Sequence, residues 1–165
     1  MNVLEAPPPG PEGPVRKTLL VVHHTVSPST HAMLSACLEG ARDPAIEGVA
    51  VVEVPALRAS AADALNADGV VVVGPVNLGY LAGAIKHFFD QVYYPCIEST
   101  ASMPYAAVLH ADGDATGALR ALESITAGLR WRRVAETVVV SGPPTAGQLD
   151  AVRDLGGVAA ATLTV

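Results

Sequence analysis

Hydroxyl side chains crowd one stretch of the sequence, residues 24–31 (HTVSPSTH), directly after the apolar segment 17–23. A serine or threonine at the start of a helix accepts hydrogen bonds from the first free N–H groups, and the partial positive charge there stabilises an anion. We expect Ser29 or Thr30 to cap a helix that begins near His31. The stretch then predicts a phosphate site whose hydroxyl groups come from Thr25, Ser27, Ser29 and Thr30.

The same stretch lacks the residues that longer phosphate chains require. A nucleoside triphosphate loop has the pattern GxxxxGK[ST], in which the lysine reaches the outer phosphates, and a dinucleotide loop has the pattern GxGxxG. Residues 24–31 contain neither a lysine nor a glycine. The sequence therefore favours one terminal phosphate over a polyphosphate. The alternative is that these hydroxyl groups only cap a helix and bind no ligand.

A second turn, residues 74–83 (GPVNLGYLAG), suits contact with a flat ring. Its glycines allow backbone conformations that a side chain would forbid, and Pro75 stiffens the entry to the turn. Exposed N–H groups along such a turn can face the polar edge of a ring, with the Asn77 amide and the Tyr80 aromatic side chain beside it. The alternative is an ordinary connection between a strand and a helix.

A third turn, residues 110–117 (HADGDATG), contains two aspartates and a histidine at the same edge of the predicted sheet as the first two turns. Asp114 has the alternative role of capping the following helix. Two carboxylates and one imidazole without a defined spacing are weak support for a metal site, and isolated histidines elsewhere are more typical of hydrogen-bonding residues. We therefore expect no bound metal, and we name no catalytic residue.

These three turns each follow a short apolar segment, and such segments alternate with longer stretches of helical periodicity. The segments are continuously apolar, as strands of a sheet covered on both faces must be. Repeated strand-then-helix units predict a doubly wound α/β fold with a parallel sheet, which binds ligands at the carboxyl ends of its strands. The predicted strands are 17–23, 48–54, 69–74, 105–111 and 135–140, and the predicted helices are 30–42, 56–67, 80–94, 115–129 and 146–161.

The helix predicted at 80–94 has the clearest pattern. It carries apolar residues at spacings of four, three and four, which form one stripe on a helix and leave Lys86 and Asp90 off it. We expect this helix to end before Pro95, because the residue before a proline avoids helical backbone angles. The stripe consists of Leu81, Ile85, Phe88 and Val92.

The turns and this helix together resemble the flavodoxin-like superfamily, in particular its branch of NAD(P)H-dependent FMN reductases and quinone oxidoreductases. Residues 25–30 (TVSPST) occupy the frame of the family's phosphate loop, [ST]-x-[ST]-G-[NS]-T, with Pro28 in place of glycine. Residues 71–91 (VVVGPVNLGYLAGAIKHFFDQ) resemble the family's ring-binding loop and the K-x-F-[LF]-D helix that follows it. Here Asn77 and Leu78 replace an aromatic that often stacks on the ring. The resemblance covers nearly all of residues 17–165.

The resemblance implies a flavodoxin-like three-layer α/β/α sandwich with a five-stranded parallel sheet of order 2-1-3-4-5. It also implies FMN held by three loops, NADH or NADPH as cosubstrate, direct hydride transfer between nicotinamide and flavin, and a homodimer or homotetramer. Carried over to this sequence, the cofactor-binding residues are Thr25, Ser27, Ser29 and Thr30 at the phosphate, Gly74, Pro75, Val76, Asn77, Leu78 and Gly79 along the ring, and Asp112 and Gly113 at its border, with Tyr80 nearby.

Composition sets the wider limits. With ten Lys plus Arg against 16 Asp plus Glu, a formal charge of -6 and no basic stripe, nucleic acid is not an expected partner. Two isolated cysteines suit a reducing cytoplasm, and the short apolar runs predict no membrane span. The Pro-rich segment 1–15 is predicted to be a flexible tail before one domain at 16–165.

The sequence hypothesis is an FMN-binding oxidoreductase that passes electrons from NAD(P)H to a small-molecule acceptor such as a quinone or a flavin. The alternative is a flavodoxin-type electron carrier, which has no NAD(P)H oxidation of its own. A phosphoryl-accepting receiver domain shares the strand order, but it needs acids after the first strand, an aspartate that ends the third strand and a lysine that ends the fifth. This sequence has His23 and His24, Gly74 and Ser141 at those places, so a receiver domain is not expected.

Overall fold

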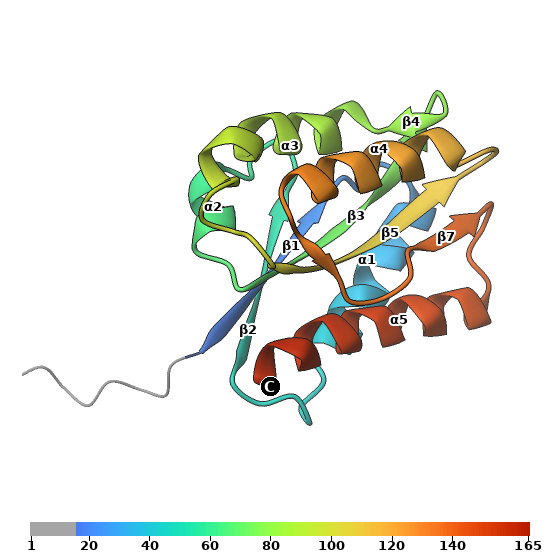
Figure 1. Cartoon of the computed structure of the whole chain (residues 1–165). Coiled ribbons are helices and arrows are strands. Elements are labelled where there is room, and N and C mark those ends of the chain that lie inside the picture. The colour runs from blue at the N-terminus through green and yellow to red at the C-terminus, as the bar shows by residue number, and fades with distance from the viewer. Residues whose placement is uncertain (1–15) are drawn as a thin grey trace, which may run out of the picture.

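The computed structural model describes residues 16–165, which form a sheet with helices on both faces (Figure 1). The predicted tail, residues 1–15, lies outside the described residues. In chain order the elements are β1 (Lys17–His23), α1 (Pro28–Ala41), β2 (Val49–Pro55), α2 (Ala61–Leu65), β3 (Gly69–Asn77), β4 (Tyr80–Leu81), α3 (Gly83–Cys96), β5 (Pro104–Ala111), α4 (Thr116–Gly128), β6 (Arg132–Arg133), β7 (Val138–Ser141), α5 (Ala146–Ala161) and a 3₁₀ turn at Thr162–Thr164.

The sheet has the predicted strand order. β2 pairs with β1, β1 with β3, and β3 with β5, all in parallel, and both β6 and β7 pair with β5. Taken together as one fifth strand, β6 and β7 complete the order 2-1-3-4-5, and β4 pairs antiparallel with the end of β3. The α/β fold class predicted from the sequence is therefore confirmed.

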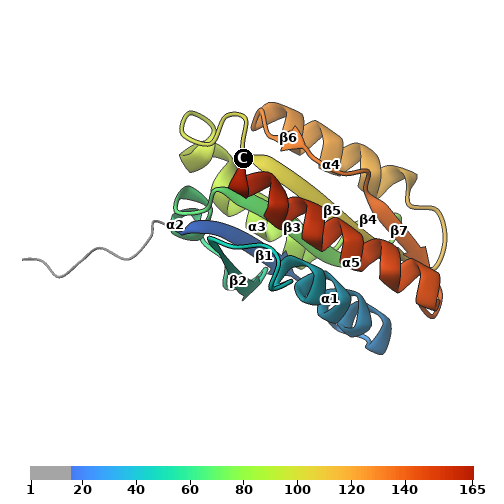
Figure 2. The ribbon, with the colours of Figure 1, turned by 90° about the horizontal axis from the view of Figure 1, so that it is seen from below.

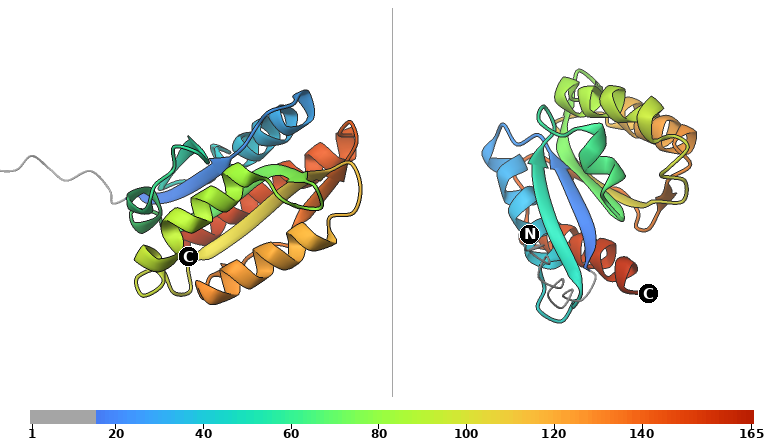
Figure 3. Two further views of the ribbon diagram at one scale, coloured as in Figure 1. Left: turned by 90° about the horizontal axis from the view of Figure 1, so that it is seen from above. Right: turned by 90° about the vertical axis from the view of Figure 1, so that its left-hand side faces the viewer.

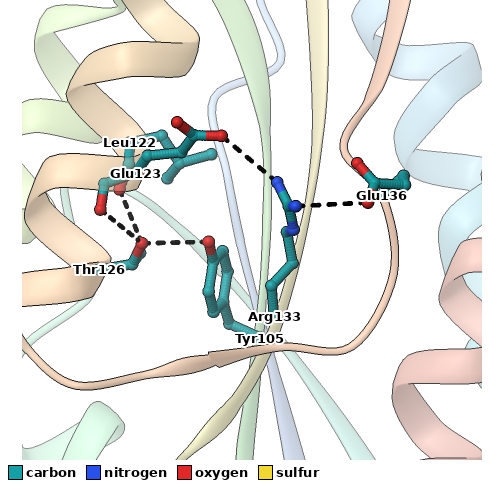
Figure 4. A network of polar contacts seen from close by, with 6 residues as sticks. All are labelled: Tyr105, Leu122, Glu123, Thr126, Arg133 and Glu136. Atoms are coloured by element: carbon teal, nitrogen blue, oxygen red, sulfur yellow. Dashed lines mark hydrogen bonds and ion pairs between the residues drawn. The ribbon is translucent and has the colours of Figure 1, made fainter.

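The fifth strand, predicted as 135–140, forms in two separate parts. β6 pairs with the start of β5 and β7 with its end. In the segment between them, Glu136 is exposed and forms an ion pair of 3.3 Å with Arg133, which also reaches Glu123 of α4 at 3.4 Å (Figure 4). Val134, the first residue of this segment, still donates its N–H to the Tyr105 carbonyl of β5 at 2.9 Å. The pairing then lapses until β7, which an edge strand allows because it has only one neighbour.

Two apolar layers enclose the sheet. α2, α3 and α4 cover one face, and α1 and α5 cover the other (Figures 2 and 3). Along β5 the side chains alternate: Ala107 and Leu109 belong to the first layer, and Ala106 and Val108 belong to the second. All four are completely buried, which explains why the strand is apolar throughout.

The boundaries of α3 correct two predictions. Residues 80–82, predicted as helix, precede it, because Tyr80 and Leu81 pair with β3 instead. The expected end before Pro95 is also wrong, since α3 continues to Cys96 with the proline in its last turn. Pro95 removes only its own N–H group from the helix. The last turn is still closed by a hydrogen bond, because the Ile97 N–H donates to the Tyr93 carbonyl at 3.0 Å.

The other helices follow the predicted ranges closely, apart from α2. That helix covers Ala61–Leu65 rather than 56–67, because Ser60 fixes its start: the Ser60 hydroxyl accepts the Asp63 N–H at 3.3 Å and the Asp63 carboxylate accepts the Ser60 N–H at 2.8 Å. Among residues 16–165, no helix has the length and hydropathy that crossing a membrane requires.

Candidate functional site

Two adjoining hollows open at the carboxyl edge of the sheet. We call the first the serine hollow, of about 350 Å³, lined by Val26, Ser27, Ser29, Pro75, Val76, Asn77, His110, Asp112, Gly142 and Pro143. We call the second the hairpin hollow, of about 540 Å³, lined by Val76, Asn77, Leu78, Gly79, Asp112, Gly113 and Asp114. The two hollows lie side by side, because both are lined by Val76, Asn77 and Asp112.

The loop between β1 and α1 is built around Thr30. Its Oγ1 accepts the N–H groups of Val26 at 3.1 Å and Ser27 at 3.0 Å, and donates to the Ser27 carbonyl at 3.0 Å. The Ser27 hydroxyl in turn accepts the Thr30 N–H at 3.2 Å, which makes a capping box. The predicted caps are therefore wrong: Ser27 is the N-cap residue, α1 begins at Pro28, and Thr30 is completely buried inside the loop.

Pro28 suits this helix start. The first N–H groups of a helix have no partner within the helix, so a proline there loses no hydrogen bond, and its fixed φ angle is already helical. Ser27 and Ser29 keep partly exposed side chains that line the serine hollow at the positive end of α1. The arrangement can place hydroxyl groups and one helix terminus around an anion.

Thr25 lies just outside this arrangement. Its Oγ1 is 3.1 Å from Nδ1 of His23, the last residue of β1. Burial lowers the pKa of His23, against the opposing effect of the Glu53 carboxylate, so its imidazole is neutral near pH 7. Thr25 thus contacts the end of the sheet rather than lining either hollow.

A tight hairpin forms one wall of the site. β3, predicted to end at Gly74, continues to Asn77 and pairs there with Tyr80 of β4. The two residues of the turn, Leu78 and Gly79, have φ angles of 54° and 73°, as the favoured two-residue hairpin turn requires. The left-handed conformation costs a leucine about 1 kcal/mol, and the side chain of Leu78 is fully exposed.

Two glycines allow close packing beside this wall, Gly117 against the hairpin and Gly74 against α3. A Cβ atom on Gly117, in the first turn of α4, would lie 2.3 Å from the Gly79 carbonyl oxygen, so the backbones of helix and hairpin are in direct contact. A Cβ atom on Gly74 would lie 3.1 Å from Cγ1 of Ile85 in α3. Gly74 is buried, lines neither hollow and gives room to α3, so its place in the structure is a packing position.

The loop after β5 adds negative charge. The Asp114 carboxylate accepts Thr116 Oγ1–H at 2.6 Å and the Thr116 N–H at 2.9 Å, and these hydrogen bonds lower the pKa of Asp114. Asp114 thereby binds the first turn of α4, although the N-cap residue itself is Ala115. No Lys or Arg is among the lining residues of either hollow. Within residues 16–165, no group of three or more His, Cys, Asp or Glu side chains is placed to hold a metal ion.

The structure brings most of the predicted residues together. Those that line the hollows are Ser27, Ser29, Pro75, Val76, Asn77, Leu78, Gly79, Asp112 and Gly113, whereas Thr25, Thr30, Gly74 and Tyr80 do not line them. Tyr80 lies in β4 with its side chain partly exposed. Sequence reasoning considered His110 and Asp114 of the third turn only for a metal or a helix cap, and it missed Val26, Gly142 and Pro143. The signal for the last two was the segment 141–144 (SGPP), a turn after a strand at the same edge.

Comparison with known proteins gives a partial match in sequence. No family model matches the chain. Over 74 residues it is 36% identical to a flavodoxin from Aquifex aeolicus (strain VF5), and the match covers 45% of this chain and 39% of that protein. The match therefore spans less than half of that relative.

Solved structures match over nearly the whole chain. A flavodoxin from the domain Archaea superposes with a TM-score of 0.76 at 15% identity, covering 90% of this chain and 99% of that one. The fold is flavodoxin-like. A flavodoxin, WrbA-like protein from Agrobacterium tumefaciens has a TM-score of 0.71 at 17% identity, covering 90% of this chain and 98% of that one. A flavodiiron protein from Giardia intestinalis matches with a TM-score of 0.78 at 14% identity, but this chain covers 37% of it.

In the flavodoxin-like fold, the strand order reverses between β1 and β3. The loop after β1 leads to α1 on one face, and the hairpin after β3 leads to α3 on the other. A crevice forms where two such loops separate, and open parallel sheets bind their ligands there. Ser27 lies on one side of this crevice and Pro75 on the other, so the serine hollow occupies the switch point.

Proposed function

We propose that this chain binds FMN in the two hollows and serves as an electron-transfer flavoprotein. The observation that carries the proposal is the pairing of an anion site with a ring site at the β1/β3 switch point. FMN has the matching shape, with one terminal phosphate at one end and a flat ring at the other. A polyphosphate nucleotide fits less well, because the lining residues include no lysine.

The side chains present fit each end of FMN. At the phosphate, the hydroxyl groups of Ser27 and Ser29 and the start of α1 are available, whereas the Thr30 hydroxyl is committed inside the loop. At the ring, the hairpin offers its backbone polar groups and the exposed side chain of Leu78, an apolar surface where related proteins often have an aromatic. When bound, FMN supplies the electron-transfer chemistry, and the chain binds and orients it.

The charge around the site favours an electron carrier over an enzyme that oxidises NADH or NADPH. Asp112 and Asp114 line the hairpin hollow, and neither hollow contains a lysine or arginine that would pair with the phosphates of NADH or NADPH. An acidic rim instead attracts a cationic protein partner and raises its association rate. The partial match to a flavodoxin supports the same proposal.

A second candidate is an NAD(P)H-dependent FMN reductase that delivers electrons to a quinone or a flavin. It is favoured by residues 84–93 (AIKHFFDQVY), whose Lys86, Phe88 and Asp90 resemble the K-x-F-[LF]-D helix of that branch. In α3, Phe88 is fully buried in the apolar layer between the sheet and the helices α2, α3 and α4, and Lys86 pairs with Asp90 at the surface. A homodimer or homotetramer and a cytoplasmic location remain predictions.

Anaerobic titration with FMN tests the proposal and separates the two candidates. We expect the flavin fluorescence to be quenched on binding, and the bound flavin to be reduced by dithionite but not by NADH or NADPH. Bleaching by NADH or NADPH would favour the reductase instead. If FMN fluorescence is unchanged at saturating protein, the proposed function is wrong.

A pair of variants locates the phosphate end in the same assay. Ser29→Ala is expected to weaken FMN binding about tenfold to a hundredfold, because it removes one hydrogen bond to a charged group, and to leave riboflavin binding unchanged. Ser99→Ala is the matched control, because Ser99 is exposed in the connection between α3 and β5. Equal effects of the two variants would place the phosphate elsewhere.

A further inference from the structure

His110 occupies a position in the serine hollow that the proposed FMN contacts do not use. It is the second-last residue of β5, on the same face as the buried Ala106 and Val108, which pack against α1 and α5. Its half-buried side chain is therefore on the side of the sheet where α1 begins and where the chain turns from β7 into α5.

A hydrogen bond joins His110 to that second turn. Its Nε2 lies 2.8 Å from the carbonyl oxygen of Gly142. Because a carbonyl oxygen can only accept, Nε2 carries the proton and donates it. Gly142 has a φ angle of 66°, in the left-handed region that favours glycine. A glycine at this position therefore lets the backbone turn so that the carbonyl faces His110.

The turn between β7 and α5 has few other backbone groups that could tie it to the sheet. Pro143 and Pro144 have no N–H group to donate. The next residue, Thr145, uses its N–H for the Gln148 side chain at 2.9 Å in the capping box of α5. The bond from His110 therefore ties this turn to the sheet at the point where Gly142 and Pro143 line the serine hollow.

We propose that His110 is a positioning residue, which holds Gly142 and Pro143 as a fourth wall of the serine hollow against the phosphate end of the ligand. The inference rests on the proposed function for the identity of the ligand. Pro143 brings no hydrogen-bond donor of its own, and its ring keeps water from the anion, which strengthens the contacts made by Ser27 and Ser29 of the same hollow. The three loops carried over from the family resemblance do not include this wall.

Two substitutions at His110 test the role of its donor in the full-length chain. His110→Leu removes the donor, and His110→Gln replaces it with a side-chain amide of similar reach. We expect His110→Leu to weaken FMN binding about tenfold and His110→Gln at most about twofold, with riboflavin binding unchanged in both. Wild-type FMN affinity in His110→Leu, or equal loss of FMN and riboflavin, would overturn the proposal.

A measurement without ligand separates this inference from the proposed function. Nitrogen NMR of the wild-type imidazole is expected to show the Nε2–H form. Hydrogen exchange at the amides of Gly142 and Thr145 is expected to be faster in His110→Leu and unchanged in His110→Gln. Unchanged exchange in His110→Leu would refute the positioning role even if FMN binds. If the wild-type chain fails to bind FMN, the proposed function and the ligand assigned to this wall are both wrong, and the exchange data decide only the link to the turn.

Discussion

Replacing Thr30 by valine removes one hydroxyl group and leaves the side-chain volume nearly unchanged. The substitution deletes the acceptor of two backbone N–H groups, from Val26 and Ser27, and one hydrogen bond to the Ser27 carbonyl. Each bond contributes about 1 kcal/mol, and an N–H group left without an acceptor costs about 1 kcal/mol or more when water cannot reach it. With partial access of water to this loop, we expect the free energy of unfolding to fall by about 2–3 kcal/mol.

Urea unfolding followed by circular dichroism measures this loss, and Thr30→Ser is the matched control. Serine keeps the hydroxyl and removes one buried methyl group, which costs about 1 kcal/mol. The predicted order of stability is therefore wild type, then Thr30→Ser, then Thr30→Val. If Thr30→Val is as stable as Thr30→Ser, the hydroxyl does not hold the loop. A large loss of FMN affinity without loss of stability would show that Thr30 faces the ligand, as the family resemblance implies.

Three further substitutions test the hairpin and the end of β1. Gly117→Ala is expected to lower the free energy of unfolding by about 2–3 kcal/mol, because its Cβ would meet the Gly79 carbonyl, whereas Gly113→Ala, which meets open space, changes it little in the same urea assay. Leu78→Gly is expected to raise that free energy by about 0.5 kcal/mol, because glycine relieves the left-handed strain at a fully exposed site; a loss would contradict this. Because burial lowers the pKa of His23 in the folded chain, the unfolded chain binds more protons, and stability is expected to fall as the pH drops below about 6.5. Unfolding measured across that range should show a smaller fall in His23→Gln than in the wild type.

The strand order and the location of the site follow from features that are local in sequence. β3 contains Val70, Val71, Val72 and Val73 in succession, and a run without polar residues requires cover on both faces of the sheet. Parallel strands then bring their following loops to one edge. Periodicity in the sequence is therefore enough to predict which loops meet, including those that contain Ser27 and Asn77.

The internal geometry of those loops depends on contacts that a sequence pattern does not show. Whether Thr30 faces outward or caps its own loop depends on the packing that buries it, and sequence alone allows both. The hairpin depends on a leucine in the left-handed region, which propensity argues against, and it is held by the contact between Gly117 and Gly79. The link from His110 to Gly142 joins residues 32 positions apart, so no local spacing predicts it.

Amide chemical shifts recorded during titration with FMN show which residues lie beside the bound cofactor. With FMN in the two hollows, we expect the largest changes at Ser29, beside the phosphate, and at Gly79 and Gly113, beside the ring, with small changes on the far edge of the sheet. Riboflavin is expected to reproduce the changes at Gly79 and Gly113 without the change at Ser29. Shifts confined to other surfaces, such as the groove lined by Tyr93 and Tyr94, or no shifts at all, would contradict an FMN site at the two hollows.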